Sequence, residues 1–315
     1  MPESFFILSQ EYLDIAIDEI AALAKMYDRF AKTVVIDNLV LVQSKTNWQE
    51  ITKRASFVKI SGQVLRKMSG LFLDEENFGE LKTAKTFACR IINLSSNEFS
   101  IPELENSMGD MISKFTNAKV DLDEPEITIY LIFTNKENFF GFSKIMKKTL
   151  RPEKIGSHPH ELDWKLTRAM INLLGIREGE AICDPFCGTG TTLLEAESMG
   201  IHGIGLDFDE KMVKMSKENI EKNAFGAEVI QSDFQEIKNI SNKYNAIVTD
   251  FPYGKSSKVS QKPENIIKKF FKIVPSHKKI AVMYKKELAD DLKIRGLKTY
   301  QIYRHKSLTR TILIK

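Results

Sequence analysis

Two short segments contain residue types that suit chemistry better than packing. The segment DPFCGTGTT, residues 184–192, follows an apolar stretch and carries Gly188 and Gly190, which let the backbone turn tightly and approach a ligand closely. The segment TDFPYG, residues 249–254, follows a second apolar stretch and places Asp250 directly before a Phe-Pro step. Because a turn by itself requires neither an acid nor two aromatic rings, the second segment indicates a reactive site.

Acidic residues near the glycine-rich segment indicate which ligand it could hold. No Lys-Ser/Thr pair follows the glycines, which excludes a P-loop, and the third glycine of the dinucleotide-binding pattern is missing. Asp184 precedes the glycines, and Asp207 ends the next predicted strand, where a carboxylate can accept both ribose hydroxyls. Asp233, after the third strand, is suited to an adenine amine, with Phe234 beside its ring. For each acid alone the alternative is a helix N-cap or a turn residue. Together they fit an adenosyl ligand without a pyrophosphate, so we expect S-adenosyl-L-methionine rather than NAD.

The residues of TDFPYG suit the methylation of an exocyclic amine on a base. Acceptors for the amine hydrogens would align the nitrogen lone pair and stabilise the cation formed on transfer. We expect Asp250 to be one acceptor and the Phe251 carbonyl, whose direction Pro252 fixes, to be the second. Tyr253 would stack on a base rotated out of its helix, and Gly254 relieves crowding where the chain turns away. The alternative is a strand that ends in an Asx-type turn with two core aromatic residues.

The C-terminal half alternates strands with helices, which predicts a parallel sheet. Such a sheet binds ligands at the carboxyl ends of its strands, where both segments lie. The predicted strands are AICDP (181–185), HGIGLD (202–207), AEVIQSD (227–233) and NAIVTD (245–250). The predicted helices are WKLTRAMINLLGI (164–176), TTLLEAESMG (191–200) and EKMVKMSKENIEKNA (210–224).

The N-terminal half predicts two smaller α+β modules. A β-α-β pattern over residues 1–75 suggests a ferredoxin-like module, with strand character in SFFIL, TVVIDNLVLVQS and SFVKISGQVLRKM. The second module, residues 76–148, has a strand in FACRIINL, a helix in PELENSMGDMISKF and paired strands over 118–144. The Pro-, Gly- and His-containing segment RPEKIGSHPHELD marks a connector, so we expect a linker over 149–160 and a third domain over 161–315.

Composition narrows the class of protein. The chain has 315 residues, enough for more than one domain, and a formal net charge of +4, but residues 255–315 carry 17 basic against 4 acidic residues. This asymmetry suggests attraction to a polyanion; the alternative is a set of solvated faces. The three cysteines assemble neither a disulfide framework nor a zinc site, so no metal is expected. No apolar run is long enough to span a membrane and the N-terminus does not read as a signal peptide, so we expect a cytoplasmic protein.

These segments resemble the amino-methyltransferases, whose usual pattern is Asp/Asn-Pro-Pro-Tyr/Phe; here Phe251 stands in place of the first proline. The order HPHELDWKLTRAMINLL then DPFCGTGTTLLEA is similar to THUMP-linked tRNA methyltransferases with a Rossmann-fold catalytic domain. FACRIINL and KVDLDEPEITIYLIF resemble the strands that close a THUMP domain, and RHKSLTRTILI resembles the final hairpin of the family. The chain looks most like the archaeal-type enzymes that methylate the N2 amine of guanosine at position 10 of tRNA.

This resemblance implies a fold, a substrate and a set of site residues. It implies a THUMP RNA-binding module over 76–148 that holds the 3′ acceptor end of tRNA, and a Rossmann-fold methyltransferase domain over 161–315. Some relatives use a small zinc-binding activator protein. The expected catalytic residues are Asp250, Phe251, Pro252 and Tyr253. The expected cofactor-binding residues are Asp184, Phe186, Gly188, Gly190, Thr191, Asp207, Asp233 and Phe234.

Basic residues and histidines around these segments have weaker indications. Lys255 and Lys258 follow TDFPYG and could hold phosphates, although a lone lysine is more often just solvated. His305, Lys306 and Arg310 would lie on the last strands. His158 and His160 could line the cofactor pocket, the alternative being a structural role in the connector.

Other functions stay open at this point. The target could be guanosine at another position of tRNA or in ribosomal RNA, because the loop does not encode the position. A DNA adenine methyltransferase uses similar loops but would need a target-recognition insertion. An inactive RNA-binding relative would have little reason to keep Asp207, Asp233 and Asp250. Direct transfer needs no covalent enzyme intermediate, so we expect neither Cys183 nor Cys187 to be a nucleophile.

Overall fold

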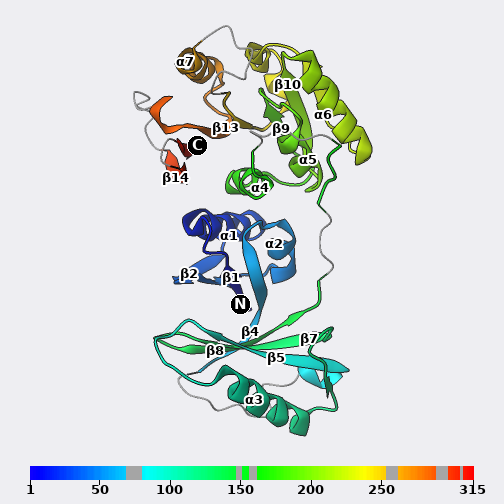
Figure 1. Ribbon diagram of the computed structural model, residues 1–315, viewed down its shortest axis with the longest axis vertical. Helices are drawn as coiled ribbons and strands as arrows, with labels where there is room; N and C mark the ends of the chain where they lie inside the picture. Colours follow the sequence, from blue (N-terminus) through cyan, green and yellow to red (C-terminus); the bar gives the residue numbers. More distant parts are fainter. Residues whose placement is uncertain (69–79, 147–150, 156–161, 253–261, 289–296, 306–307) are drawn as a thin grey trace. The chain divides into compact units, whose positions relative to one another are not determined.

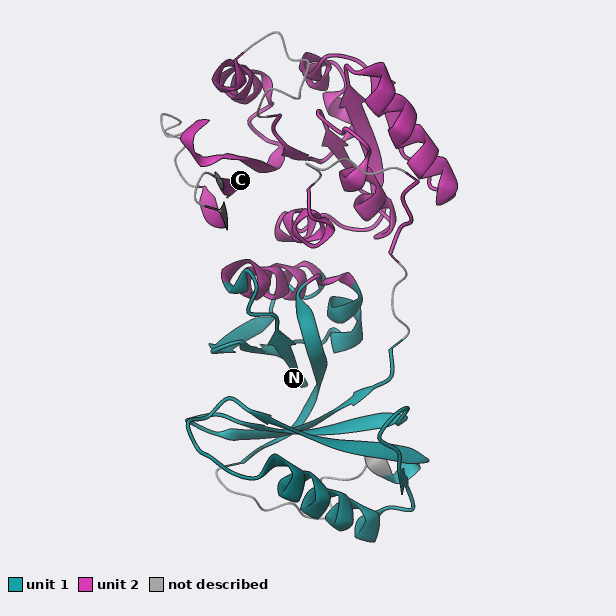
Figure 2. Cartoon of the chain, viewed as in Figure 1, with its two compact units in different colours: residues 1–13, 27–53, 57–149 teal, residues 14–26, 54–56, 150–315 magenta. Residues whose placement is uncertain are grey.

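The computed structural model describes residues 1–68, 80–146, 151–155, 162–252, 262–288, 297–305 and 308–315. The chain forms two compact units, coloured separately in Figure 2. Unit 1 comprises residues 1–13, 27–53 and 57–149, and unit 2 comprises residues 14–26, 54–56 and 150–315. Residues 14–26 therefore belong to the second unit although the chain on both sides of them belongs to the first. The predicted limits at residues 75 and 148 stay predictions.

Unit 1 is built on one eight-stranded sheet in the order β2-β3-β1-β4-β8-β7-β5-β6 (Figure 1). Its strands are β1 (Glu3–Leu8), β2 (Lys32–Ile36), β3 (Leu39–Gln43), β4 (Val58–Met68), β5 (Thr86–Asn93), β6 (Lys119–Val120), β7 (Ile127–Phe133) and β8 (Asn138–Lys144). Its helical segments are α2 (Trp48–Arg54), η2 (Glu80–Thr83) and α3 (Ile101–Phe115). Antiparallel pairing of β4 with β8 joins the strands of the two predicted N-terminal modules into a single sheet.

Glycines allow β4 and β8 to approach each other closely. A Cβ atom at Gly62 would lie 2.2 Å from the Phe142 carbonyl oxygen, and one at Gly141 would lie 2.4 Å from the Gln63 carbonyl oxygen. The fully buried Phe5 ring packs over the same place. A side chain at either glycine would therefore force the two strands apart, so glycine is required where the modules meet.

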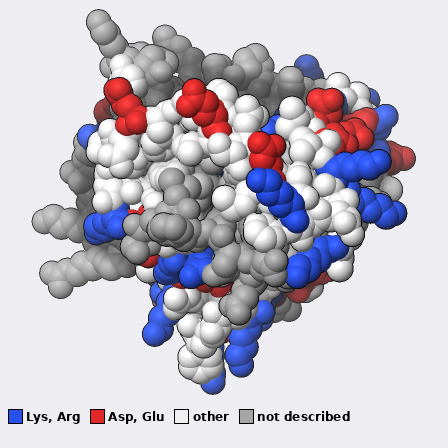
Figure 3. Space-filling view, turned by 90° about the horizontal axis from the view of Figure 1, so that it is seen from below, with Lys and Arg blue, Asp and Glu red and all other residues white. Residues whose placement is uncertain are grey.

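Helix α3 covers one part of this sheet. It begins with Pro102 in its first turn, has Glu103 near its start and Lys114 near its end, and buries Met108 and Ile112 in a core with residues of β5, β7 and β8. Figure 3 shows the protein from below relative to Figure 1. In this view the described Lys and Arg side chains are interspersed with Asp and Glu side chains.

Unit 2 contains a seven-stranded sheet in the order β11-β10-β9-β12-β13-β15-β14. The strands are β9 (Ala181–Asp184), β10 (His202–Asp207), β11 (Glu228–Gln231), β12 (Ala246–Asp250), β13 (Lys279–Lys285), β14 (Lys298–His305) and β15 (Leu308–Ile314). Strands β9 to β13 run parallel, whereas β15 is antiparallel to β13 and to β14. The α/β fold, the parallel sheet and the final hairpin predicted from the sequence are confirmed.

The helices of unit 2 include most of α1 (Figure 1). They are α1 (Leu13–Tyr27), α4 (Trp164–Leu173), α5 (Thr191–Glu197), α6 (Glu210–Lys222) and α7 (Pro263–Ile273), with short 3-10 segments η3 (Phe234–Lys238), η4 (Ser241–Lys243) and η5 (Lys286–Leu288). Asp163 caps α4 by accepting hydrogen bonds from the N–H groups of Lys165 and Leu166. No helix within the described part of the chain has the length and apolar character needed to cross a membrane.

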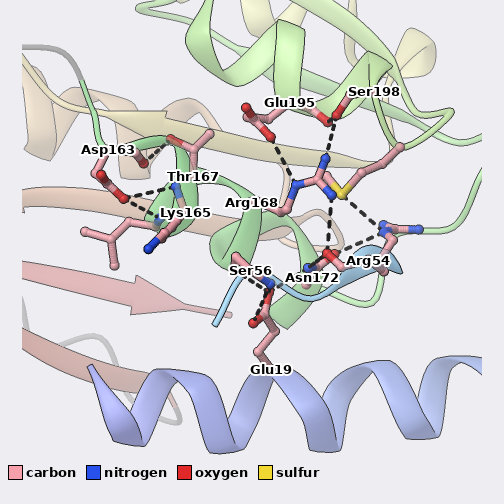
Figure 4. A network of polar contacts seen from close by, with 12 residues as sticks. Glu19, Arg54, Ser56, Asp163, Lys165, Thr167, Arg168, Asn172, Glu195 and Ser198 are labelled. Atoms are coloured by element: carbon pink, nitrogen blue, oxygen red, sulfur yellow. Dashed lines mark hydrogen bonds and ion pairs between the residues drawn. The ribbon is translucent and has the colours of Figure 1, made fainter. Parts of the chain in front are cut away.

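A buried polar network joins α1 to α4 inside unit 2 (Figure 4). The Glu19 carboxylate accepts hydrogen bonds from the Ser56 N–H at 3.1 Å and from the Asn172 side-chain amide at 2.7 Å. Asn172 accepts from Nε of Arg54 at 3.0 Å, and Nη2 of Arg54 donates to the Ile176 carbonyl at 2.6 Å. Because these buried groups satisfy one another, the network holds α1 against the rest of unit 2.

Candidate active site

Four acidic residues lie at the carboxyl ends of four neighbouring strands. Asp184 ends β9, Asp207 ends β10, Asp250 ends β12, and Asp233 follows β11 by two residues. These strands are neighbours in the order β11-β10-β9-β12 and run parallel. Their carboxyl ends therefore meet at one edge of the sheet, the site edge, where parallel α/β sheets bind ligands. The strand order between β9 and β12 reverses here, as expected for a ligand site.

The glycine-rich loop after β9 needs both glycines, for different reasons. Gly188 and Gly190 have φ angles of +51° and +88°, in the region that favours glycine. A Cβ atom at Gly190 would lie 2.5 Å from Oγ of Ser216, a fully buried residue of α6, so Gly190 allows α5 to pack on α6. Within the described part of the chain, a Cβ atom at Gly188 would meet no atom within 4 Å. The loop surface is therefore open at Gly188, so a ligand can approach the backbone there.

Asp207 stands beside this open surface and is held in place by the backbone. Its Oδ2 accepts a hydrogen bond from the Gly188 N–H at 2.9 Å, and its Oδ1 accepts one from the Asp209 N–H at 2.9 Å. Burial raises the pKa of this half-buried carboxyl above its ordinary value. Each carboxylate oxygen can accept more than one hydrogen bond, so Asp207 can also accept from ribose hydroxyls.

Asp184 holds the site edge together from inside. Its Oδ1 accepts hydrogen bonds from Oγ1 of Thr249 at 2.5 Å and from the Phe186 N–H at 3.1 Å. The carboxyl is 3% exposed, and burial raises its pKa to about 6. Asp184 thus ties the loop after β9 to β12, and direct contact between Asp184 and a cofactor stays a prediction.

Aromatic rings pack beneath the site edge. The half-buried Phe186 ring lies 5.2 Å from the Phe234 ring and 5.5 Å from the Phe251 ring, between centroids. Phe251 is 1% exposed and meets Phe270 of α7 edge to face at 5.0 Å. The phenylalanine that replaces the usual proline is therefore a core residue. Asp233 is exposed and caps η3 by accepting from the Gln235 N–H.

Asp250 pairs with a basic residue that the sequence pattern did not single out as part of the site. Nη1 of Arg310, on β15, lies 3.2 Å from Oδ2 of Asp250. The Arg310 and Asp250 side chains are 8% and 18% exposed, so the ion pair is largely shielded from solvent and Arg310 is not part of a solvated basic face. In the sequence, a lysine- and arginine-rich tail indicates a surface, and only the strand order shows that one of its arginines points inward.

Two further residues at the site edge carried no sequence signal. Nζ of Lys154 donates to Oγ1 of Thr191 at 2.7 Å and to Oγ1 of Thr189 at 3.1 Å, which places a positive charge at the glycine-rich loop. Phe208, directly after Asp207, is 47% exposed. An exposed ring next to the expected ribose acceptor is suited to the face of an adenine.

Several expected residues lie outside the described part of the chain. They are Tyr253, Gly254, Lys255, Lys258, His158, His160 and Lys306. The backbone of His305 ends β14, but its side chain is not described. Pro252 is described and half-buried directly after Phe251.

The described residues fit S-adenosylmethionine. Its net charge is not negative, so acids at neighbouring strand ends do not repel it, whereas they would repel the pyrophosphate of NAD. Gly188 provides the open backbone surface and Asp207 the oriented carboxylate. The parallel sheet and the residues at its site edge are those of a Rossmann-fold methyltransferase that depends on S-adenosylmethionine.

Comparisons with known proteins give the family. A family model described as "RMKL-like, methyltransferase domain" matches residues 151–289, and one described as "DNA methylase" matches residues 10–218, ending before β12. The tRNA (guanine(10)-N2)-dimethyltransferase of Methanothermobacter thermautotrophicus is 31% identical, with 87% of each chain covered. That of Methanocaldococcus jannaschii is 28% identical, covering 98% of this chain and 97% of the relative. The crystal structure of TrmN from Thermus thermophilus shares the fold, with a TM-score of 0.56 and 17% identity over 100% of this chain and 99% of that one. The chain belongs to the tRNA (guanine(10)-N2)-dimethyltransferase family.

Proposed function

We propose that this protein transfers methyl groups from S-adenosylmethionine to the N2 amine of guanosine 10 in tRNA, once or twice. The observation that carries the proposal is the position of Asp250, at the end of β12 and one strand away from the glycine-rich loop of β9. A carboxylate there can meet the target amine next to a cofactor held at Gly188 and Asp207. Membership of the tRNA (guanine(10)-N2)-dimethyltransferase family indicates that the target amine is N2 of guanosine 10.

The residues of the chain divide the work between binding and orientation. Bound S-adenosylmethionine supplies an electrophilic methyl group on a sulfonium sulfur. Gly188 and Asp207 would hold the nucleoside part of the cofactor, with Phe208 against the adenine face. Asp233, exposed two residues after the end of β11, would accept a hydrogen bond from the adenine amine.

The N2 amine of guanine is a weakly nucleophilic nitrogen that carries two hydrogens. Asp250 would accept a hydrogen bond from the guanine amine, and the Phe251 carbonyl would accept the second. Two acceptors orient the nitrogen lone pair toward the methyl group and stabilise the positive charge that develops as the N–C bond forms and the S–C bond breaks. S-adenosylhomocysteine would be the leaving group, and the Asp250 carboxylate could take the proton that the methylated nitrogen must lose. Packing of Phe251 against Phe270 would hold that carbonyl in place, taking over the rigidity of the proline usual at this position.

The cysteines have no part in this transfer. Cys183 and Cys187 are buried and free, and burial raises the pKa of both thiols well above the ordinary value. A buried neutral thiol is a poor nucleophile, which supports direct transfer without a covalent enzyme intermediate.

The test is incubation of the purified protein with unmodified tRNA transcript and labelled S-adenosylmethionine, followed by nucleoside analysis of the digested RNA. We expect N2-methylguanosine, N2,N2-dimethylguanosine or both, mapped to position 10. Methylation elsewhere in the tRNA would contradict the position. Label that appears only after addition of a small zinc-binding protein would show the activator that some relatives use. Because tRNA is the substrate, we expect the protein in the cytoplasm.

A further inference from the structure

The ion pair between Arg310 and Asp250 spans three strands. Asp250 of β12 is in register with Met283 of β13, and Met283 is in register with Ile312 of β15. Arg310 lies two residues before Ile312, so its side chain is on the same face of the sheet as that of Ile312. The guanidinium reaches across β13: Nη1 lies 3.5 Å from Sδ of Met283 and 3.2 Å from Oδ2 of Asp250.

The surroundings make this pair more than a surface contact. Arg310 is 8% and Asp250 18% exposed at the side chain, so solvent screens the charges weakly. A buried guanidinium stabilises the ionised form of a neighbouring carboxylate and fixes its direction. Removing one partner takes away the opposite charge that this ion pair supplies to the other, which is costly where solvent screens weakly.

We propose that Arg310 is a positioning residue that holds Asp250 ionised and oriented toward the target amine. The proposal rests on the proposed function, since it assigns Arg310 a part in the same transfer. Arg310 binds Asp250 rather than tRNA or cofactor, and its contribution passes through the Asp250 carboxylate. It also gives a reason for an aspartate here: an asparagine would remove the negative charge that pairs with Arg310.

The test is a double-substitution cycle on the full chain with Arg310→Gln, Asp250→Asn and the combination. The readouts are the single-turnover methylation rate at saturating tRNA and cofactor, and the dissociation constants of S-adenosylhomocysteine and tRNA. We expect Arg310→Gln to lower the rate by about 10-fold or more, with both dissociation constants within about 3-fold of wild type. The double variant should be about as slow as Asp250→Asn alone, because Arg310 acts through the Asp250 carboxylate, which that variant no longer has.

A matched control separates positioning from general stability. Arg168 of α4 is also a buried arginine, 7% exposed and paired with Glu195 at 3.0 Å, but it lies outside the site. Arg168→Gln should lower the melting temperature and leave the rate of the folded protein unchanged. Arg310→Lys keeps the charge without the planar guanidinium and should give a rate between those of wild type and Arg310→Gln. If Arg310→Gln does not fold, a wild-type rate in folded Arg310→Lys would overturn the positioning role.

The outcomes distinguish the two proposals. A wild-type rate in folded Arg310→Gln, or fully multiplicative losses in the double variant, would overturn the positioning role and leave the proposed function intact. Weaker tRNA binding with an unchanged saturating rate would also overturn it, and would make Arg310 an RNA contact. No transfer by the wild-type protein to any tRNA would overturn the proposed function and this inference with it.

Discussion

Substitutions at Gly188 and Gly190, the two glycines of the glycine-rich loop, should separate effects on stability from effects on cofactor affinity. We consider three single substitutions in unit 2: Gly188→Ala, Gly190→Ala and, as the control, Gly175→Ala. All three glycines have positive φ angles, +51°, +88° and +58° respectively. Among the described residues, a Cβ atom meets no atom within 4 Å at Gly188 or Gly175, whereas at Gly190 it would lie 2.5 Å from Oγ of Ser216.

These geometries give different costs. A left-handed conformation costs an alanine about 1–2 kcal/mol, and this applies to all three substitutions. Overpacking against the buried Ser216 adds about 1–3 kcal/mol at Gly190 alone. We therefore expect a loss in unfolding free energy of about 1–2 kcal/mol for Gly188→Ala and Gly175→Ala, and about 2–5 kcal/mol for Gly190→Ala.

Cofactor affinity should follow a different order. A methyl group at Gly188 occupies the surface proposed for the ligand, and a steric cost of about 1.4–3 kcal/mol corresponds to roughly 10- to 100-fold weaker binding. Gly175 follows α4 and is not on the glycine-rich loop, so its substitution should leave affinity unchanged. Urea unfolding gives the stabilities, and titration calorimetry with S-adenosylhomocysteine gives the affinities.

A second-site substitution checks the packing argument. Ser216→Ala removes Oγ and leaves Cβ, which lies 3.4 Å from the Cβ position at Gly190, an ordinary contact distance. Gly190→Ala combined with Ser216→Ala should therefore recover the overpacking part of the loss and keep the left-handed part. A loss of stability in Gly190→Ala no larger than that in Gly175→Ala would contradict the proposed overpacking. Wild-type affinity of Gly188→Ala for S-adenosylhomocysteine would contradict the proposed ligand surface.

Three further predictions follow from buried groups. Because burial raises the pKa of Asp184 to about 6, the folded state binds the extra proton between pH 3.8 and 6 and loses stability as pH rises through this range. From pH 5.0 to 7.5 the wild type should lose about 1.4 kcal/mol more unfolding free energy than Asp184→Asn; equal pH dependence in urea titrations would contradict this. Cys183→Ser and Cys187→Ser should each keep the single-turnover rate of the folded protein, and a dead but folded variant that binds cofactor would rule out direct transfer. Arg54→Met should cost about 2–4 kcal/mol by urea unfolding, because it removes the donors of buried acceptors that include the Asn172 and Ile176 oxygens, whereas Lys53→Met on the exposed side of α2 should stay within about 0.5 kcal/mol.

The C-terminal half was the more predictable part of the fold. Its strands and helices alternate with clear apolar spacing, so the strand ends that carry Asp184, Asp207 and Asp250 could be located before their pairing was known. The tight turn at Gly188 and Gly190 was expected from residue type, and their left-handed φ angles are how the backbone makes it. These features depend on residues that are close together in the sequence, so they can be predicted from a single sequence.

Long-range pairing was not predictable in the same way. The single sheet of unit 1 depends on β4 meeting β8, and the glycines that permit it, Gly62 and Gly141, are 79 residues apart. The segment TVVIDNLVLVQS has strand character throughout, but Asp37 takes a φ of +52° and turns it into the β2–β3 hairpin.

Charge was the least reliable guide. Arg310 belongs to a strongly basic tail, which favours a surface position, yet it is buried against Asp250 because β15 inserts next to β13. Phe251 looked like a departure from the family pattern, and its packing against Phe270 supplies the reason for a phenylalanine there.

The most direct test of methylation at the N2 amine compares two tRNA transcripts that differ only in the exocyclic amine of the base at position 10. One carries guanosine at position 10, and the other carries inosine there, which lacks only the exocyclic amine. With labelled S-adenosylmethionine and the purified protein, we expect N2-methylated guanosine from the first transcript and no label at position 10 of the second. The Asp250→Ala variant should bind S-adenosylhomocysteine normally and methylate the first transcript about 100-fold more slowly or worse. Equal labelling of both transcripts, or near-normal turnover by Asp250→Ala, would contradict the claim that Asp250 presents the N2 amine of guanosine 10 for methylation.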